Sequence, residues 1–149
     1  MKDIRKTAEA ANFTAIDLGK MNELQDFVLE LDSGLKIPGK VFGGTALKAT
    51  GGEFSFQMFR PGTETGFLHT HKKHEELYFF LSGSGTFQVD GHVFPVTEGS
   101  VVRVAPEGKR SVRNNGDAPL VMLCVQYRGD TFTEEDASDG RILSEAVRW

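Results

Sequence analysis

The 149-residue sequence has a single cysteine, Cys124, and a single tryptophan. One cysteine cannot form a disulfide within the chain, which excludes a disulfide-stabilised scaffold and gives no sign of an oxidising compartment. The longest uninterrupted apolar runs, at 77–81 and 120–125, are too short to span a bilayer. The first residues contain no apolar segment typical of a signal peptide. The sequence therefore predicts a cytoplasmic protein with no membrane partner.

Basic residues are also scarce, because 17 lysines and arginines face 21 aspartates and glutamates and leave a net charge of −4. A broad nucleic-acid-binding surface requires the opposite balance. No helix-turn-helix pattern accompanies the strand-like segments, so a role as a transcription factor has no support. We expect a small-molecule partner and no nucleic acid.

Glycine is abundant instead: 14 of the 17 glycines lie between Gly34 and Gly116. Between these turns, apolar and polar residues alternate with the period of a half-buried strand. The predicted strands are 40–48, 54–58, 76–82, 86–90, 92–96, 102–104, 110–114 and 119–127. Asp90-Gly91 is a strong two-residue hairpin signal, and residues 82–85 are interpreted as a second hairpin turn. The spacing predicts an all-β sandwich or barrel.

Helices are expected only near the ends of the chain, since no segment between the strands is long enough for a helical crossover. Asn22 with Gln25 resembles a capping box, and Thr133 with Asp136 repeats the pattern more weakly. The length predicts one domain, 1–149, which can bury a sizeable core without a disulfide or a structural metal.

The densest group of potential metal ligands precedes the predicted strand 76–82, where His69, His71 and His74 are followed by Glu75 and Glu76. On an extended chain, residues two apart point the same way, so His69 and His71 can direct both rings at one point. A carboxylate from the next strand would complete a face of two histidines and one carboxylate, which suits Fe(II) and does not exclude Mn, Ni or Zn.

Strand parity alone does not decide which glutamate joins the two histidines. Glu76 shares a face with Tyr78, whereas Glu75 shares the opposite face with Leu77. His74 has the opposite parity to His71 and is kept as a possible extra ligand. His92 follows a hairpin glycine and is expected to be exposed.

Two motifs resemble those of the cupin superfamily. The first runs from Gly66 to Gly83 and contains His69-x-His71, four residues, Glu76, six residues and Gly83. The second runs from Gly99 to Asn115 and contains Pro106-x-Gly108. The resemblance implies an antiparallel double-stranded β-helix, the jelly-roll barrel, with short helices near the termini. It also implies a homodimer, a site inside the barrel mouth, and Glu76 as the metal-binding carboxylate.

The same resemblance divides the chain into an N-terminal arm with a lead-in strand at 1–39, a barrel core at 40–128 and a C-terminal segment at 129–149. The second motif departs from the family pattern at the fourth metal ligand, normally a histidine, where Ser111 stands. A serine hydroxyl is a poor ligand for a transition metal, so two outcomes stay open. Either two histidines and Glu76 hold a metal with open positions, or the pocket works without one.

Further residues are predicted to contact a substrate. Arg113 has the same strand parity as Ser111, and an inward arginine could pair with a carboxylate or phosphate. Met58 and Tyr78 would contribute to an apolar pocket wall. Lys72, Lys73, Lys109 and Arg110 are interpreted as solvated loop charges, and Cys124 as a small core residue.

Two functions follow from this pattern. One is a metal-dependent isomerase, dioxygenase or decarboxylase acting on a small anionic metabolite. The other is a cupin that binds or senses a small ligand without catalysis, with weak or no metal binding. The residues do not choose between an enzyme and a binding module.

Overall fold

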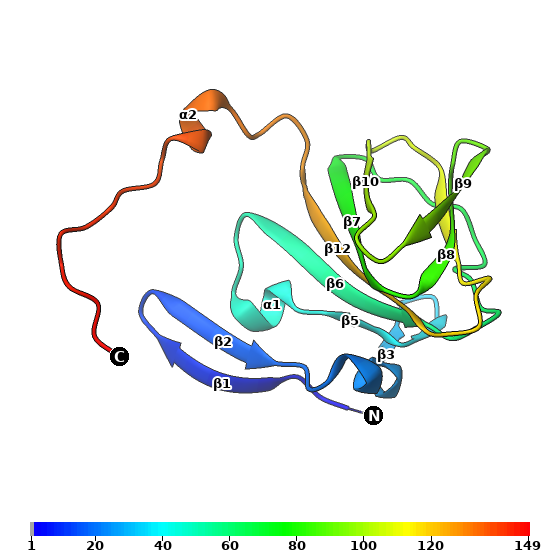
Figure 1. Ribbon diagram of the computed structural model, residues 1–149, viewed down its shortest axis with the longest axis horizontal. Helices are drawn as coiled ribbons and strands as arrows, with labels where there is room; N and C mark the ends of the chain where they lie inside the picture. Colours follow the sequence, from blue (N-terminus) through cyan, green and yellow to red (C-terminus); the bar gives the residue numbers. More distant parts are fainter. Residues whose placement is uncertain (1) are drawn as a thin grey trace.

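A computed structural model describes residues 2–149 of the chain (Figure 1). Its elements, in chain order, are β1 (Arg5–Ala10), β2 (Phe13–Asp17), the 3₁₀ helix η1 (Met21–Asp26), β3 (Val28–Glu30), β4 (Lys36–Pro38), β5 (Lys40–Phe42), α1 (Gly44–Leu47), β6 (Gly52–Phe59), β7 (His74–Ser82), β8 (Ser84–Val89), β9 (His92–Thr97), β10 (Val101–Val104), β11 (Arg110–Arg113), β12 (Leu120–Arg128) and α2 (Glu134–Ala137).

Two antiparallel sheets form the body of the molecule (Figure 1). The larger sheet has the strand order β10-β7-β12-β6-β5, and the smaller one has the order β11-β8-β9. Neighbours in both sheets are mostly distant in sequence, as expected of a jelly roll. The predicted all-β class is therefore confirmed, and the few helices are short.

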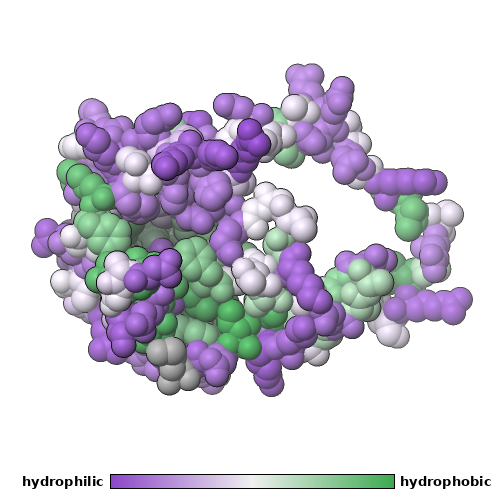
Figure 2. Space-filling view, turned by 180° about the vertical axis from the view of Figure 1, so that it is seen from behind, coloured by the Kyte–Doolittle hydropathy of each residue, from purple (hydrophilic) through white to green (hydrophobic). Residues whose placement is uncertain are grey.

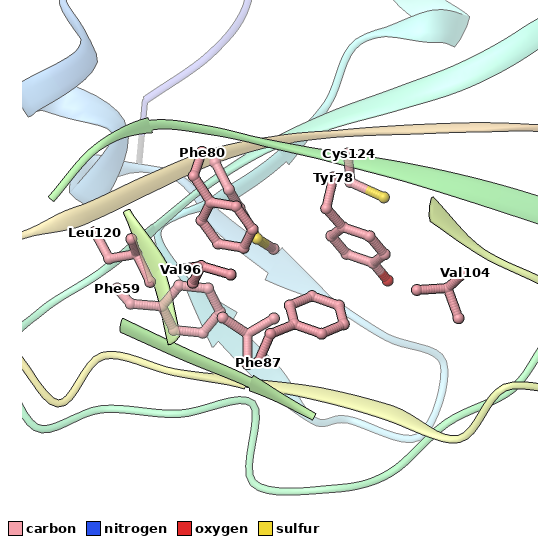
Figure 3. Packing of buried hydrophobic residues seen from close by; sticks show 10 residues of the cluster. Phe59, Tyr78, Phe80, Phe87, Val96, Val104, Leu120 and Cys124 are labelled. Carbon is pink, nitrogen blue, oxygen red and sulfur yellow. The ribbon is translucent and has the colours of Figure 1, made fainter. Parts of the chain in front are cut away.

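The hydrophobic core lies between these two sheets (Figure 3). The inner face of the larger sheet contributes Tyr78 and Phe80, and the smaller sheet contributes Phe87. The Phe87 ring packs edge-on against the other two rings, at centroid distances of 5.0 Å from Tyr78 and 6.1 Å from Phe80. Phe87 is fully buried, so it connects the two sheets through aromatic contacts.

A second cluster covers the other face of the larger sheet. Leu24 and Phe27, at η1 and its end, pack with Val41, Met58 and Val121. These three strand residues alternate with inward-facing neighbours, so the sheet is covered on both faces near β5 and β6.

The predicted hairpin at Asp90-Gly91 is confirmed, because both residues have positive φ and connect the paired strands β8 and β9. The turn at Gly83 differs from the prediction. It joins β7 in the larger sheet to β8 in the smaller one, so it is a corner between sheets rather than a hairpin. Gly83 has a φ of +82°, and a Cβ there would lie 2.3 Å from the carbonyl oxygen of Pro119.

The predicted strand 40–48 is shorter in the structure. β5 ends at Phe42, and α1 follows, because Gly43 and Gly44 allow the close approach of the Phe54 ring and the Glu53 carboxylate. The N-terminal segment also forms two small hairpins, β1-β2 and β3-β4, which were not predicted. The residues of β1 are all exposed, so this strand has no apolar alternation to reveal it.

The helices near the ends are as short as predicted. In α2 the Thr133–Asp136 capping box forms, whereas η1 begins after Lys20 without a side-chain cap. The segment after β12 runs through α2 and away from the two sheets (Figure 1). Among residues 2–149, no helix has the length and apolar composition required to cross a membrane.

Candidate functional site

Glu76 lies at the centre of the site, on the inner face of β7. It is opposite Val104 of β10 and Gln126 of β12, and it shares its face with the core residue Tyr78. Glu75 has the opposite parity and pairs with Arg103 on the outer side. The register thus leaves Glu76 as the inward carboxylate.

His69 and His71 lie in the loop that precedes β7, and backbone hydrogen bonds fix this loop to the second motif. The amide of His71 donates to the carbonyl of Pro106 at 2.8 Å, and the amide of Arg110 donates to the carbonyl of His69 at 3.2 Å. The Nε2 of His71 lies 3.0 Å from Oε1 of Glu76, and the Nε2 of His69 lies 4.0 Å from Oε2. Both histidines therefore reach the same carboxylate.

Glu76 is almost completely buried, and polar groups surround both of its oxygens. Gln126 donates to Oε1 at 2.7 Å, and the Tyr78 hydroxyl donates to Oε2. Burial by itself raises the pKa of Glu76, but the hydrogen bonds from Tyr78 and Gln126 and the charge of Arg110 outweigh it and lower the pKa to about 2. The carboxylate is therefore ionised at neutral pH.

Arg110 is the residue whose placement differs most from the sequence interpretation. It was expected to be a solvated loop charge, yet its side chain is fully buried. Its Nε lies 3.0 Å from Oε2 of Glu76, an ion-pair distance without hydrogen-bond alignment, and its Nη1 donates to the carbonyl of Gly108 at 2.8 Å. Arg110 therefore lies beside Glu76, whereas Ser111, which the resemblance matches to the fourth ligand, does not contact it.

The register of β11 explains this correction. Val112 faces Phe87 in the core, so Arg110 and Val112 share the inner face. Ser111 and Arg113 have the opposite parity and lie across from Gln88 and Thr86. The apolar Val112 could have indicated from the sequence that Arg110, two residues earlier, faces inward. The motif spacing counted from Gly108 indicated Ser111 as the inward residue instead.

The three predicted ligands do come together: ligand atoms of His69, His71 and Glu76 all lie within 4.8 Å of one another. Burial lowers the pKa of His69 to about 4, and the charge of Glu76 only partly opposes it, so this ring is neutral near pH 7. Its buried Nδ1 has no hydrogen-bond partner among residues 2–149. A neutral imidazole at His69 and an ionised carboxylate at Glu76 are donor forms that a divalent metal requires, and His71 adds a second imidazole, so the residues fit such an ion.

A cavity of about 940 Å³ opens beside this group. Polar residues on its wall include His69, His71, Glu76, Arg110 and Gln126. Its apolar lining comes from the larger sheet, from the β3-β4 hairpin and from the loop before β7, and includes Leu29, Leu31, Leu35, Ile37, Phe42, Phe59, Phe67, Tyr78 and Met122. Figure 2 shows hydrophobic residues gathered around a hollow in one face of the molecule. The cavity is large enough for an organic ligand.

The remaining predicted site residues lie around this cavity in different ways. Tyr78 borders it, and Ser111 lies between it and a smaller cavity of about 390 Å³. Arg113 is exposed and borders the smaller cavity, away from the histidines. Met58 borders the large cavity but belongs to the second cluster on the opposite face of the sheet. His74 is exposed, with its ring 5.6 Å from that of His71.

Residues that the sequence interpretation missed also face the cavity. Lys40 and Gln57 are paired across β5 and β6, and Gln126 contacts Glu76 from β12. Gln57 lies on the same face of β6 as the buried Phe59, and Gln126 lies on the same face of β12 as the buried Cys124. Lys40 is on this face because it is paired with Gln57. Cys124 is buried, as predicted, and burial together with the Glu76 charge raises the pKa of its thiol to about 12.

Comparison with known proteins agrees with this architecture. Residues 55–126 match the Cupin domain family. A cupin protein from Bacteroides fragilis has a similar solved structure, with 26% identity, a TM-score of 0.67, and coverage of 96% of this chain and 99% of that one.

Two curated relatives match a shorter segment. An uncharacterized protein of Methanocaldococcus jannaschii is 35% identical over 46% of this chain and 54% of its own length. An oxalate-binding protein of Thermotoga maritima is 32% identical over 48% of this chain and 59% of its own length. The chain thus spans somewhat more than half of these relatives. The matched segment begins within β6 and ends within β12, so it includes both motifs, and the chain belongs to the cupin superfamily.

Proposed function

We propose that this cupin holds a divalent transition metal through His69, His71 and Glu76 and acts on a small anionic metabolite in the adjoining cavity. The observation that carries the proposal is the convergence of three ligand atoms within 4.8 Å beside a cavity of about 940 Å³. A divalent ion held there would polarise a carbonyl or carboxylate oxygen of the ligand.

The protein's own residues divide the remaining tasks. Glu76 supplies the negative charge that attracts a cation, and Tyr78 and Gln126 fix its orientation through hydrogen bonds. Arg110, whose charge is beside the same carboxylate, favours an anionic ligand over a neutral one. The name of the Thermotoga maritima relative, an oxalate-binding protein, supports an anion as the ligand class.

The Arg110–Glu76 pair also favours a second candidate, an anion-binding cupin that works without a metal. The buried guanidinium offsets the charge of Glu76, and no third imidazole in the described part of the chain stands beside it. Both effects reduce the attraction of the site for a divalent ion. The two candidates share the cavity and differ in the species that fills its polar end.

Elemental analysis of protein purified without a polyhistidine tag separates them. The metal proposal expects about one equivalent of Fe, Mn, Ni or Zn per chain, and loss of that metal in His71→Ala. His74→Ala is the matched control, since His74 is a neighbouring but exposed histidine outside the ligand group. If the protein carries only trace metal, and none of the four ions raises its Tm when added, the metal proposal fails and the second candidate stands.

A further inference from the structure

A second polar group lies in the cavity, on elements other than those of the histidines and Glu76 but close enough for the Lys40 and Glu76 charges to influence each other. Lys40 of β5 is paired with Gln57 of β6, and both side chains border the cavity. Glu76 of β7 is paired with Gln126 of β12, which is in turn paired with Glu53 of β6. Glu53 precedes Gln57 by four residues along β6. At about 3.3 Å per residue, the two groups are separated along the strand by roughly 13 Å of backbone.

Lys40 carries a charge that the protein leaves without an acidic partner. Among residues 2–149 it forms no ion pair, and its Nζ lies 5.3 Å from the centre of the Phe42 ring. Glu76 is occupied by several donors, and Glu64, another carboxylate at the cavity, is exposed. A cation beside a largely apolar cavity is costly unless an anion joins it.

Gln57 offers an amide beside this ammonium group. The residue is 4% exposed, borders the cavity, and makes no side-chain hydrogen bond within the described part of the chain. Its amide atoms are not among the fully buried polar atoms that lack a partner, so they face the cavity and can bond water or a ligand there. A carboxylate can accept from the Lys40 ammonium and from the Gln57 amide at once.

Much of the remaining cavity wall is apolar and extends to the surface, although Lys36, Arg60 and Glu64 also border the cavity. The β3-β4 hairpin, which lies outside the matched cupin segment, contributes Leu29, Leu31, Leu35 and Ile37. Leu31 and Leu35 are 38% and 45% exposed, so part of this wall still faces solvent. A two-carbon dicarboxylate cannot cover such a surface, whereas a ring or branched alkyl group can.

We propose that Lys40 and Gln57 form a carboxylate-binding subsite, and that the ligand of this cavity is an organic acid whose bulky apolar body packs against the β3-β4 hairpin. This inference rests on the proposed function only in using the same cavity. It deepens that function by naming the ligand class, and it holds for the metal-bound and the metal-free protein.

Binding of 2-naphthoate, followed by isothermal titration calorimetry, tests the subsite against its uncharged analogue 2-naphthamide and against oxalate. We expect the wild type to prefer naphthoate over naphthamide by about 10- to 100-fold, the range for a hydrogen bond to a charged group. Lys40→Met should remove most of that preference, leaving the share due to Arg110, and should leave naphthamide binding within about twofold, whereas Lys40→Arg should retain it. Lys36→Met is the matched control, because Lys36 also borders the cavity but is exposed and pairs with Glu30.

The apolar wall is tested separately with Leu35→Ser, which should weaken naphthoate and naphthamide equally. Oxalate should bind the wild type at least about 10-fold more weakly than naphthoate, because it has no body to bury. The inference is overturned if Lys40→Met keeps the preference for the acid, if oxalate binds as tightly as naphthoate, or if naphthoate does not bind at all. The titrations are repeated with a chelator present. The preference for naphthoate should persist in the metal-free protein, so loss of the metal proposal alone would not remove it.

Discussion

Arg110 and Glu76 form a buried ion pair at the floor of the cavity, with Nε of the arginine 3.0 Å from Oε2 of the glutamate. The two side chains come from opposite sheets, since Arg110 begins β11 and Glu76 lies in β7. The pair therefore joins the smaller sheet to the larger one at the site. The positive charge of Arg110 and the negative charge of Glu76 also set the electrostatic potential that a metal ion or an anion meets at this site.

Arg110→Met should lower the free energy of unfolding by about 3–5 kcal/mol, because it leaves the Glu76 charge buried without its partner. Urea unfolding monitored by circular dichroism measures this loss. Lys109→Met, at the exposed neighbouring residue, should change stability by less than about 0.5 kcal/mol. Equal stabilities for the two variants would contradict the role of the ion pair. In the double variant with Glu76→Gln, part of the loss should be recovered.

Arg110→His should increase the affinity for a divalent metal by about 10-fold or more, because it replaces a repelling guanidinium with a further imidazole beside Glu76. Ser111→His is the informative control. Its side chain has the parity of Gln88, away from Glu76, and should bring no increase. Titration of metal-free protein with Zn²⁺ in competition with a chromophoric chelator compares the variants. A larger gain for Ser111→His would show that the register of β11 is wrong.

Lys40 should make stability depend on pH in the alkaline range. Burial lowers its pKa in the folded protein below the ordinary value of 10.5, and the charge of Glu76 only partly opposes this. Between these two pKa values the unfolded chain binds more protons at Lys40 than the folded one, so the contribution of Lys40 to the free energy of unfolding rises with pH. The raised pKa of Cys124 contributes in the opposite direction, and comparison with Lys40→Met isolates the part due to Lys40.

Urea unfolding at a series of pH values approaching 10.5 measures that slope. Lys40→Met should lose the contribution, whereas Lys36→Met, at an exposed lysine of the same cavity rim, should keep it. Parallel curves for wild type and Lys40→Met would show that Lys40 is solvated.

Phe87→Ala should destabilise the fold by about 3–5 kcal/mol, since the fully buried ring joins the aromatic contacts between the sheets. Phe132→Ala is the matched control, because that ring is 76% exposed and should contribute less than about 0.5 kcal/mol. Thermal unfolding of both variants gives the comparison. A loss of stability in Phe87→Ala as small as that in Phe132→Ala would contradict the role of Phe87 in the core.

Local alternation was sufficient to predict the strand around Phe87, because its apolar face is the buried one. It also located the strand around Phe56, but there the polar Ser55 and Gln57 are buried while Phe56 is only partly buried. Residues Arg5–Ala10 and Lys36–Pro38 lack that contrast, so their hairpins could not be recognised. The corner at Gly83 looked like a hairpin, because the same glycine-rich sequence suits both and only long-range pairing separates them.

The pair His69 and His71 was predictable from its spacing, whereas the choice of Glu76 over Glu75 came from the resemblance to the cupin motif. Arg110 was not predictable, because its burial depends on a partner 34 positions earlier and on the parity of Val112. Lys40 was missed for a similar reason: pairing with Gln57 brings it to the cavity from outside either motif.

The central claim is that His69 and His71, with Glu76, bind a divalent metal, and the chain has only four histidines with which to test it. The most direct measurement follows all four imidazole rings by NMR, with ¹⁵N-labelled histidine, while Zn²⁺ is added to metal-free protein. The account predicts that the ring signals of His69 and His71 shift and saturate at about one equivalent, while those of His74 and His92 stay in place. Unchanged signals at His69 and His71, or equal shifts at all four rings, would contradict it.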